Sequence, residues 1–586
     1  MKKQLKALAI CMTLVLGTSS AVNVYAEGDA TASPDTGTKE QGNEPPTGSA
    51  PAGGAPGGEA PTGGMPQGGQ GGGANTMTYD YTGTLSGALT ADGEEVTSDA
   101  ETSTASEADQ NAALVQNGGT LKITNGTLEK SGDDTNGDNC NFYGINSILL
   151  SVNDGSFAYI ANSKLNASSE GSNAMFATDG GTVYANSDTI TTSAGNSRGL
   201  DATYGGTIVA NDMTISTQGD HSASAATDRG GGSISLTNST LNTAGSGSPL
   251  LYSTGDIEVS NVTGTSSGSQ IAGMEGLNTI LIYSSELTST NTEKTASDPM
   301  ADGIIIYQST SGDAESTTGE TASFEASNST LKSAIKSGAM FYFTNTSANV
   351  VLSDTVLDFD SDNALLMAVQ GNDSNNWGTA GSNGAEVSFT ALNETLNGDI
   401  DVDTISSLNL YLLEGSVYTG STSISENAVN TNVTEAPIAV NVSADSKWVV
   451  TADSTVSNLN AEEGAQIVDS EGKTVTIAAN CETVVDGDSD ITVTVNGTYS
   501  TAIVTDDSNA LSSDFIDRTA FDAFYGTSTS FASNSTDAEP TAEPSASASA
   551  ETSEVGTKSQ NTDAALIAVA VVAAVIIAIV IKKKKD

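Results

Sequence analysis

The stretch Met175-Phe176-Ala177-Thr178, followed by Gly180-Gly181-Thr182 and Asn186, states a phrase that the chain repeats three more times. The later copies begin at positions 200, 224 and 251 and read LDAT, SAAT and LYST. Their closing threonines stand at 178, 203, 227 and 254, so the spacings are 25, 24 and 27 residues. The asparagines stand at 186, 211, 238 and 261, with spacings of 25, 27 and 23 residues. A period in the twenties without a helical pattern predicts a solenoid of short strands.

Apolar and polar residues alternate within each copy, which predicts strands with one buried face. Two columns are expected to point inward, and they contain Met175, Leu200 and Leu251, and Ala177, Ala202 and Ala226. The column between them is expected to point outward, and it contains Phe176, Asp201, Ala225 and Tyr252. The paired glycines suit tight corners, and the asparagine column predicts a ladder of side-chain hydrogen bonds between coils.

Related phrases extend on both sides of the four copies, from about residue 110 to about 505. Stacking of the coils predicts three parallel sheets around a narrow core. About 25 residues per coil gives roughly 17 coils and a rod near 80 Å long as an upper bound, because inserted loops also use residues. Phe515, Phe521, Phe524 and Tyr525 follow the last coil and are expected to cap it.

The phrase Gly-Gly-Thr, a hydrophobic run and Asn-x-Thr-Leu resembles right-handed parallel β-helix proteins, both pectate-lyase-like folds and bacterial adhesin passenger domains. Residues 399–410 and 447–456 resemble the coils of adhesins in particular. The resemblance implies an all-β chain folded as a right-handed parallel β-helix solenoid, and it covers about residues 110–505. It is informative about the fold and says little about activity, because one fold supports many functions.

The composition restricts the class of partner. The 586-residue chain has a formal net charge of −52 and contains a single histidine. Such a surface repels nucleic acid and anionic lipid, and its simplest role is solubility at a cell surface. Cys140 and Cys481 lie 341 residues apart, so we expect no disulfide between them in a solenoid of local contacts.

The segments at both ends differ from the repeats. We expect a signal peptide at 1–26, a disordered Gly/Pro-rich leader at 27–76, the β-helix with its end caps at 77–525 and a Ser/Thr/Glu/Pro stalk at 526–563. Residues 564–581 are 18 uninterrupted apolar residues, which predicts a transmembrane helix, and the basic tail 582–586 is expected in the cytoplasm. The predicted localisation is therefore the cell membrane, with a single pass and an extracellular N-terminal ectodomain.

The rare residue types gather in and beside the four copies. Two of the three arginines and the only histidine fall between positions 198 and 229. The candidate ligand-binding residues are Phe176, Arg198, Asp201, Tyr204, His221, Asp228, Arg229, Tyr252 and Glu275. Aromatic rings can stack on sugar faces while carboxylates accept hydrogen bonds from hydroxyl groups, so these residue types suit a glycan. The competing interpretation is structural, with Arg198 and Arg229 paired to aspartates of neighbouring coils.

Catalysis and metal binding have less support in the sequence. A polysaccharide lyase would need Arg198 or Arg229 with Asp201 and Asp228, and no family catalytic motif is present to carry over. No cofactor is expected. Two runs of Asp, Asn and Gly, at 134–138 and 486–490, are weak candidates for binding calcium. Both lack the glycine and the glutamate of an EF-hand loop, and both match solvated turns better. The alternation at 358, 360 and 362 is interpreted as the polar face of a strand.

The sequence thus favours a membrane-anchored extracellular protein, adhesin-like or glycan-binding, over an enzyme. The expected partner is a glycan or another extracellular or host-surface ligand. Two alternatives stay open: a polysaccharide lyase or glycoside hydrolase on the same scaffold, and a passive structural spacer.

Overall fold

The computed structural model describes residues 78–309, 314, 321–374, 377–529 and 531. All described residues belong to one unit of the chain, Met1–Phe531. The predicted signal peptide, leader and transmembrane segment therefore lie outside the described residues. Among the residues that are described, no helix combines the length and the apolar character needed to cross a membrane.

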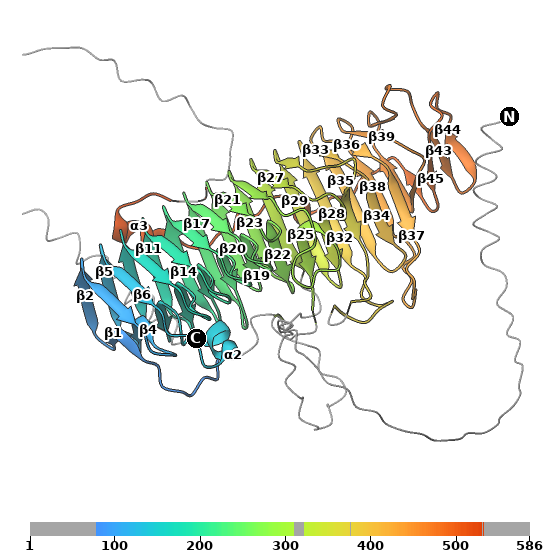
Figure 1. Ribbon diagram of the computed structural model, residues 1–586. Helices are drawn as coiled ribbons and strands as arrows, with labels where there is room; N and C mark the ends of the chain where they lie inside the picture. The colour runs from blue at the N-terminus through green and yellow to red at the C-terminus, as the bar shows by residue number, and fades with distance from the viewer. Residues whose placement is uncertain (1–77, 310–313, 315–320, 375–376, 530, 532–586) are drawn as a thin grey trace, which may run out of the picture. The chain divides into compact units, whose positions relative to one another are not determined.

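The described chain is an all-β parallel solenoid in which successive strands enter different sheets in turn (Figure 1). Sheet A has 13 strands: β1 (Gly87–Asp92), β4 (Asn111–Gln116), β7 (Leu149–Val152), β10 (Met175–Thr178), β13 (Leu200–Ala202), β16 (Ala225–Thr227), β19 (Leu251–Ser253), β22 (Ala272–Glu275), β25 (Asp302–Tyr307), β28 (Ala339–Thr344), β31 (Leu365–Val369), β34 (Ile400–Asp403) and β37 (Thr422–Ser425). Sheet B has 15 strands: β2 (Glu95–Asp99), β5 (Thr120–Thr124), β8 (Phe157–Ala161), β11 (Thr182–Asn186), β14 (Gly206–Asn211), β17 (Gly232–Thr237), β20 (Asp256–Ser260), β23 (Thr279–Tyr283), β26 (Ala322–Ser327), β29 (Ser347–Ser353), β32 (Glu386–Leu392), β35 (Ser407–Leu413), β38 (Ile438–Val442), β41 (Asn458–Ala461) and β46 (Tyr499–Ser500).

The third side of the rod consists of two shorter sheets. Sheet C has 10 strands: β3 (Thr102–Ala105), β6 (Thr127–Lys130), β9 (Lys164–Ala167), β12 (Thr189–Thr192), β15 (Thr214–Thr217), β18 (Thr240–Thr243), β21 (Thr263–Ser266), β24 (Glu286–Ser289), β27 (Thr330–Ser333) and β30 (Val356–Asp358). Sheet D continues with β33 (Thr395–Asn397), β36 (Val417–Gly420), β39 (Lys447–Val450) and β42 (Gln466–Val468). Sheet E closes the C-terminal end with β40 (Ser454–Val456), β45 (Thr492–Val495), β43 (Thr476–Ala479) and β44 (Glu482–Val485), and its β43 and β44 pair antiparallel.

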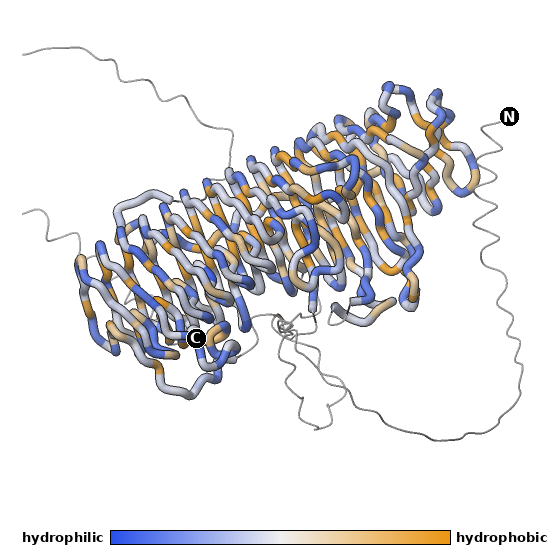
Figure 2. The backbone as a smooth tube through the Cα atoms, viewed as in Figure 1, coloured by the Kyte–Doolittle hydropathy of each residue, from blue (hydrophilic) through white to orange (hydrophobic). Residues whose placement is uncertain are grey.

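The core is a continuous apolar column inside the rod, which Figure 2 shows as short apolar segments on each coil separated by hydrophilic corners. The first inward column is confirmed for Met175, Leu200 and Leu251, which lie in one paired row. Ala225, predicted to face outward, lies in the same row between Leu200 and Leu251 and faces inward. The prediction for the third copy is wrong by one residue. Ala226 aligns with Asp201 and Tyr252 and faces outward, whereas Thr227 aligns with Ala202.

An extra residue in the corner after the third copy explains this shift. Ala202 is four residues before Gly206 (206 − 202), whereas Thr227 is five residues before Gly232 (232 − 227), although both pairs align in the sheets. Aligning Thr227 with Thr203 by sequence therefore paired Ala226 with Ala202, whereas in the sheet Thr227 pairs with Ala202. Because side chains alternate with a period of two, this moved Ala226 to the wrong face.

The predicted asparagine ladder is confirmed. The Nδ2 amide of Asn211 donates to Asn186 Oδ1 at 2.8 Å, Asn238 donates to Asn211 at 2.7 Å and Asn261 donates to Asn238 at 2.6 Å. The ladder runs along the corner between sheets B and C. Asn238 and Asn261 occupy the left-handed region there, with φ of 52° and 56°, which asparagine tolerates better than most residues.

The predicted C-terminal cap is wrong. After β46, residues 505–529, here named the strap, do not cover the last coil and instead run back along the outer face of sheet B. The strap contains η2 (Asp507–Asn509) and α3 (Thr519–Tyr525), and Figure 1 shows α3 beside the early strands of the rod. Tyr525 Oη donates to the carbonyl oxygens of Ile160 and Tyr184, on β8 and β11.

Candidate functional site

Sheet A is the face on which the sequence placed its candidates, and its outer surface is partly covered by the chain itself. The connection from β6 to β7 contains α2 (Gly137–Tyr143), which Asn136 caps by accepting a hydrogen bond from the Asn139 amide. The helix ends at Gly144, whose φ is 67°. A Cβ atom on Gly144 would lie 2.6 Å from the Phe176 ring, so this close approach requires glycine.

Phe176 is therefore a packing residue. Its side chain is fully buried in an apolar cluster with Leu114 and Leu150, against which Tyr79 and Leu85 of the first described segment also pack. A ring with no exposed surface cannot stack on a sugar. The structure removes Phe176 from the candidate site.

Arg198 forms a buried ion cluster under α2. Its guanidinium lies 3.1 Å from Asp228 and 3.5 Å from Asp201, and it donates at 2.9 Å to the side chain of Asn141 on the helix. Asp201 is fully buried, and Asp228 is 5 % exposed. Burial raises the pKa of the Asp201 carboxyl well above its ordinary value, and the positive charge of Arg198 opposes this rise.

Arg229 and Tyr204 also contact α2, through its residues Phe142 and Tyr143. The Arg229 guanidinium carbon lies 3.9 Å from the centroid of the Phe142 ring, a cation–π contact. Tyr204 stacks on Tyr143 with ring centroids 5.6 Å apart. The structural interpretation of Arg198 and Arg229 is thus the one that these contacts support, because both side chains hold the helix on the sheet.

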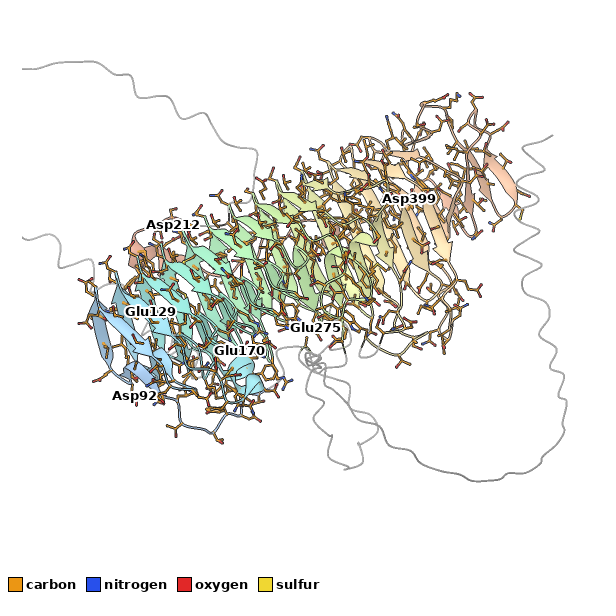
Figure 3. All side chains as sticks on the ribbon, viewed as in Figure 1. Asp92, Glu129, Glu170, Asp212, Glu275 and Asp399 are labelled. Carbon is orange, nitrogen blue, oxygen red and sulfur yellow. The ribbon has the colours of Figure 1, made fainter. Side chains whose placement is uncertain are left out.

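The three remaining candidates lie elsewhere. Tyr252 donates to Glu275 at 2.8 Å, and Tyr307 donates to the same carboxylate oxygen at 3.1 Å. Glu275 is only 3 % exposed and lies in the middle of the rod (Figure 3). His221 is exposed at the corner between sheets C and A, with φ of 53°. The nine predicted residues therefore do not converge on one open groove.

The structure contains a groove that the sequence did not identify. It follows the corner between sheets C and D and sheet A, has a volume of about 470 Å³ and spans four successive coils. Its lining includes Leu357, Asp358, Phe359, Ser361, Asp362, Asn397, Gly398, Asp399, Thr419, Gly420 and Thr451. Figure 3 labels Asp399, nearer the C-terminal end of the rod than Glu275.

The turn at the groove overturns one sequence interpretation. Only Asp358 belongs to β30, and the next residues form a turn in which Asp360 accepts hydrogen bonds from Asn363. Asp360 and Asp362 are therefore turn residues and not part of a strand face. The signal in the sequence was three acidic residues at alternate positions, and a single sequence cannot separate a strand face from an Asp-rich turn.

The groove is lined by acids, hydroxyls and one aromatic ring. Asp358 and Asp399 are exposed, while the Phe359 ring is half-buried. Two lysines beside the groove pair with aspartates: Lys332 pairs with Asp358 of the lining, and Lys336 pairs at 3.1 Å with Asp360, which lies next to it. Carboxylates and hydroxyls can accept and donate hydrogen bonds to a polyhydroxylated ligand, and the ring can stack on it.

Within the described part of the chain, no group of three or more His, Cys, Asp or Glu side chains is arranged to hold a metal ion. Cys140 is a buried free thiol on α2. In comparisons with known proteins, no family model matches this chain, and no curated protein matches it either.

Proposed function

We propose that this chain is an adhesin-like, membrane-anchored surface protein that binds a glycan in the corner groove of a right-handed parallel β-helix. The observation that carries the proposal is the lining of the groove, where three carboxylates, several hydroxyls and one aromatic ring face the same space. Its volume of about 470 Å³ lies within the usual range of ligand sites, about 300–1,000 Å³.

The charge of the groove defines the class of glycan. Asp358, Asp362 and Asp399 line it, and no lysine or arginine does. An acidic polysaccharide would meet repulsion there, whereas a neutral sugar can donate its hydroxyl hydrogens and an amino sugar adds an ionic contact. We therefore propose neutral or amino-bearing glycans, and not uronates or sulfated chains.

The placement of long connections also favours this side of the rod. The connections from β6 to β7, β24 to β25, β31 to β32 and β37 to β38 all enter or leave sheet A. Insertions in repeat proteins map to loops on one face, which is often the binding face. The groove lies along one edge of that same sheet, at the starts of β31 and β34.

An enzyme built on the sequence candidates is disfavoured. A lyase base must reach a substrate proton, and Arg198 is 8 % exposed beneath the protein's own helix α2. Asp201 and Asp228 share that burial. If the protein is a passive spacer, its groove binds no ligand. The binding experiment below therefore distinguishes a spacer from a glycan-binding protein.

The test is a glycan array probed with the full-length protein in mild detergent. We expect retention on neutral or amino-bearing glycans, and at least tenfold weaker binding after Asp399→Asn, because a hydrogen bond to a charged group contributes about 1.5–3 kcal/mol. Phe359→Leu keeps apolar volume and removes the ring face, so it should also weaken binding. Asp212→Asn changes the charge equally on a distant coil and should bind as the wild type does.

Three results would contradict the proposal. One is an array with no glycan retained, which favours the spacer. Another is binding confined to acidic glycans. The third is wild-type affinity in both groove variants, which would place the ligand elsewhere on the rod.

A further inference from the structure

The strap follows a single row of residues along the rod. This row is the outward column of sheet B, in which each residue pairs with the next one. Its members are Tyr159, Tyr184, Val209, Ser235, Glu258, Leu281, Glu325, Val351 and Thr390. Eight coil intervals at about 4.8 Å give about 38 Å of contact. The strap thus crosses the strands nearly at right angles and links coils that are hundreds of residues apart in sequence.

Its contacts are made in order along the row. Asn509 donates to Thr390 at 2.8 Å, near the start of the strap. The amides of Ser512 and Ile516 then donate to the carboxylates of Glu325 and Glu258, at 2.9 Å and 3.1 Å. Each carboxylate is 3–4 % exposed, so the strap covers both.

Arg518 is the main fixed point of the strap. Its guanidinium donates to the Ser235 carbonyl at 2.9 Å, the Ala210 carbonyl at 3.0 Å and the Thr237 hydroxyl at 3.0 Å. It also donates to Thr529 at 2.8 Å, which holds the returning end of the strap. Phe524 then stacks on Tyr159 with ring centroids 4.0 Å apart.

The sheet does not need the strap for its own hydrogen bonds. Every strand of the row is paired on both sides by strands of sheet B, and the strap forms no strand. Strap side chains reach outward side chains of the sheet and four of its main-chain carbonyls, those of Ile160, Tyr184, Ala210 and Ser235. Detachment would therefore break no strand pairing, which makes the strap a separate unit of local stability.

The charges on the two surfaces oppose docking at high pH. The strap carries five aspartates, at 506, 507, 514, 517 and 522, against one arginine, a net charge of −4 (5 Asp − 1 Arg). Below it lie Glu258, Glu325 and Asp256, and a cavity of about 370 Å³ adjoins Glu258 and Asp514. In the described part of the chain, Arg518 is the cation whose charge lowers the pKa of Glu258. Ionisation of the buried glutamates therefore places negative charge against an acidic strap.

We propose that the strap is a releasable clamp, docked in mildly acidic surroundings and loosened in neutral to alkaline ones, while the solenoid beneath it stays folded. Docked, it brings the chain back to Phe531, whose ring lies 6.2 Å from that of Tyr283, so the chain leaves from the side of the rod. Released, the 25 residues of the strap (529 − 505 + 1) can extend from the last coil by up to about 85 Å. The clamp thus sets the reach of the rod from whatever holds its C-terminus.

The direction of the pH effect follows from proton linkage. Burial raises the pKa of Glu258 to about 7 and raises that of Glu325, whereas hydrogen bonds from the strap and from Ser235 or Tyr283 act in the opposite direction. The docked state therefore binds protons more tightly than the released state. Docking weakens as pH rises from about 4.5 to about 7, and it recovers as pH falls.

The test is hydrogen exchange measured by mass spectrometry on the full-length protein in detergent, at pH 5.5 and pH 8.0. We expect the protection factors of the Ser512, Ile516 and Gly526 amides to fall on the order of tenfold at the higher pH, because of the linkage of Glu258. The amides of β17 and β20 should keep their protection. Such a pattern identifies release of the strap without unfolding of the coils.

Variants distinguish release of the strap from a general loss of stability. The double variant Glu258→Gln with Glu325→Gln should remove most of the pH dependence, with Asp256 as the acid that remains beneath the strap, whereas Asp507→Asn, which removes one exposed charge, should retain it. Arg518→Ala should lower strap protection at both pH values and leave β17 protected. If the double variant does not fold, the wild-type comparison still decides. Exchange of the strap at the same rate as β17 and β20 at both pH values would overturn the proposal, as would an unchanged pH dependence in the double variant.

Discussion

Asp188 offers the sharpest quantitative test of how the corners of the rod are built. It is 1 % exposed at the corner between β11 and β12. Its Oδ1 accepts a hydrogen bond from the Ser163 amide at 2.7 Å, and its Oδ2 has no hydrogen-bond partner among the described residues. Corners further along place a serine in this role, as where Ser239 accepts from the Met213 amide at 2.9 Å. A carboxyl thus occupies a position that a hydroxyl can fill.

The magnitude follows from the change in pKa on folding. Burial raises the pKa of Asp188 from 3.8 to about 8, against the effect of its backbone hydrogen bonds from Ser163 and Asn186. The folded state binds the proton more tightly, so stability falls as pH rises between these two values. Between pH 5 and pH 8 the loss amounts to about 4 kcal/mol, at about 1.4 kcal/mol for each pKa unit.

The perturbation is Asp188→Ser, and the assay is urea denaturation followed by circular dichroism at pH 5 and pH 8. We expect the variant to match the wild type within about 1 kcal/mol at pH 5, since the hydroxyl retains the hydrogen bond. At pH 8 it should be more stable than the wild type by several kcal/mol.

The reciprocal variant Ser239→Asp provides the control, and it should lose stability at pH 8 more than at pH 5. The reasoning is refuted if Asp188→Ser shifts the midpoint equally at the two pH values. It is also refuted if Asp188→Ser destabilises the protein at pH 8.

Three further outcomes follow from the described contacts. Arg198→Ala should cost about 3–5 kcal/mol in urea denaturation, because it leaves Asp201 and Asp228 buried without their cation, and an unchanged midpoint would contradict the ion cluster. Glu275→Gln should cost about 1–3 kcal/mol, because an amide oxygen replaces the carboxylate that accepts from two tyrosines, and denaturation would measure it. Burial raises the pKa of the Glu394 carboxyl to about 8, so the stability of the wild type should fall as pH rises toward that value. Glu394→Gln should therefore flatten the pH dependence of the free energy of unfolding. Identical pH profiles for the variant and the wild type would argue against this account.

The candidate site shows how far a single sequence can lead. Clustering of rare residue types correctly marked a place where charges meet, because Arg198, Asp201 and Asp228 do come together. It could not show whether that place is open, since the cover is α2, a segment that lies 55 residues before Arg198 at its nearest end (198 − 143). The corner groove could not be predicted from the sequence, because no repeated pattern marks it. Its walls come from four coils whose loops follow no repeat.

The sequence by itself determined the local architecture: the short strands, the inward columns in three of the four copies and the asparagine ladder. Each of these depends on residues one coil apart, so a period of about 25 residues carries the information. The tertiary structure alone decided the register of Ala226, the covering of Arg198, Asp201 and Asp228 by α2, the corner groove and the course of the strap. These depend on corner lengths and on contacts such as Tyr525 with Ile160, 365 residues apart. Periodicity carries no information about such contacts, because they join segments that share no repeat.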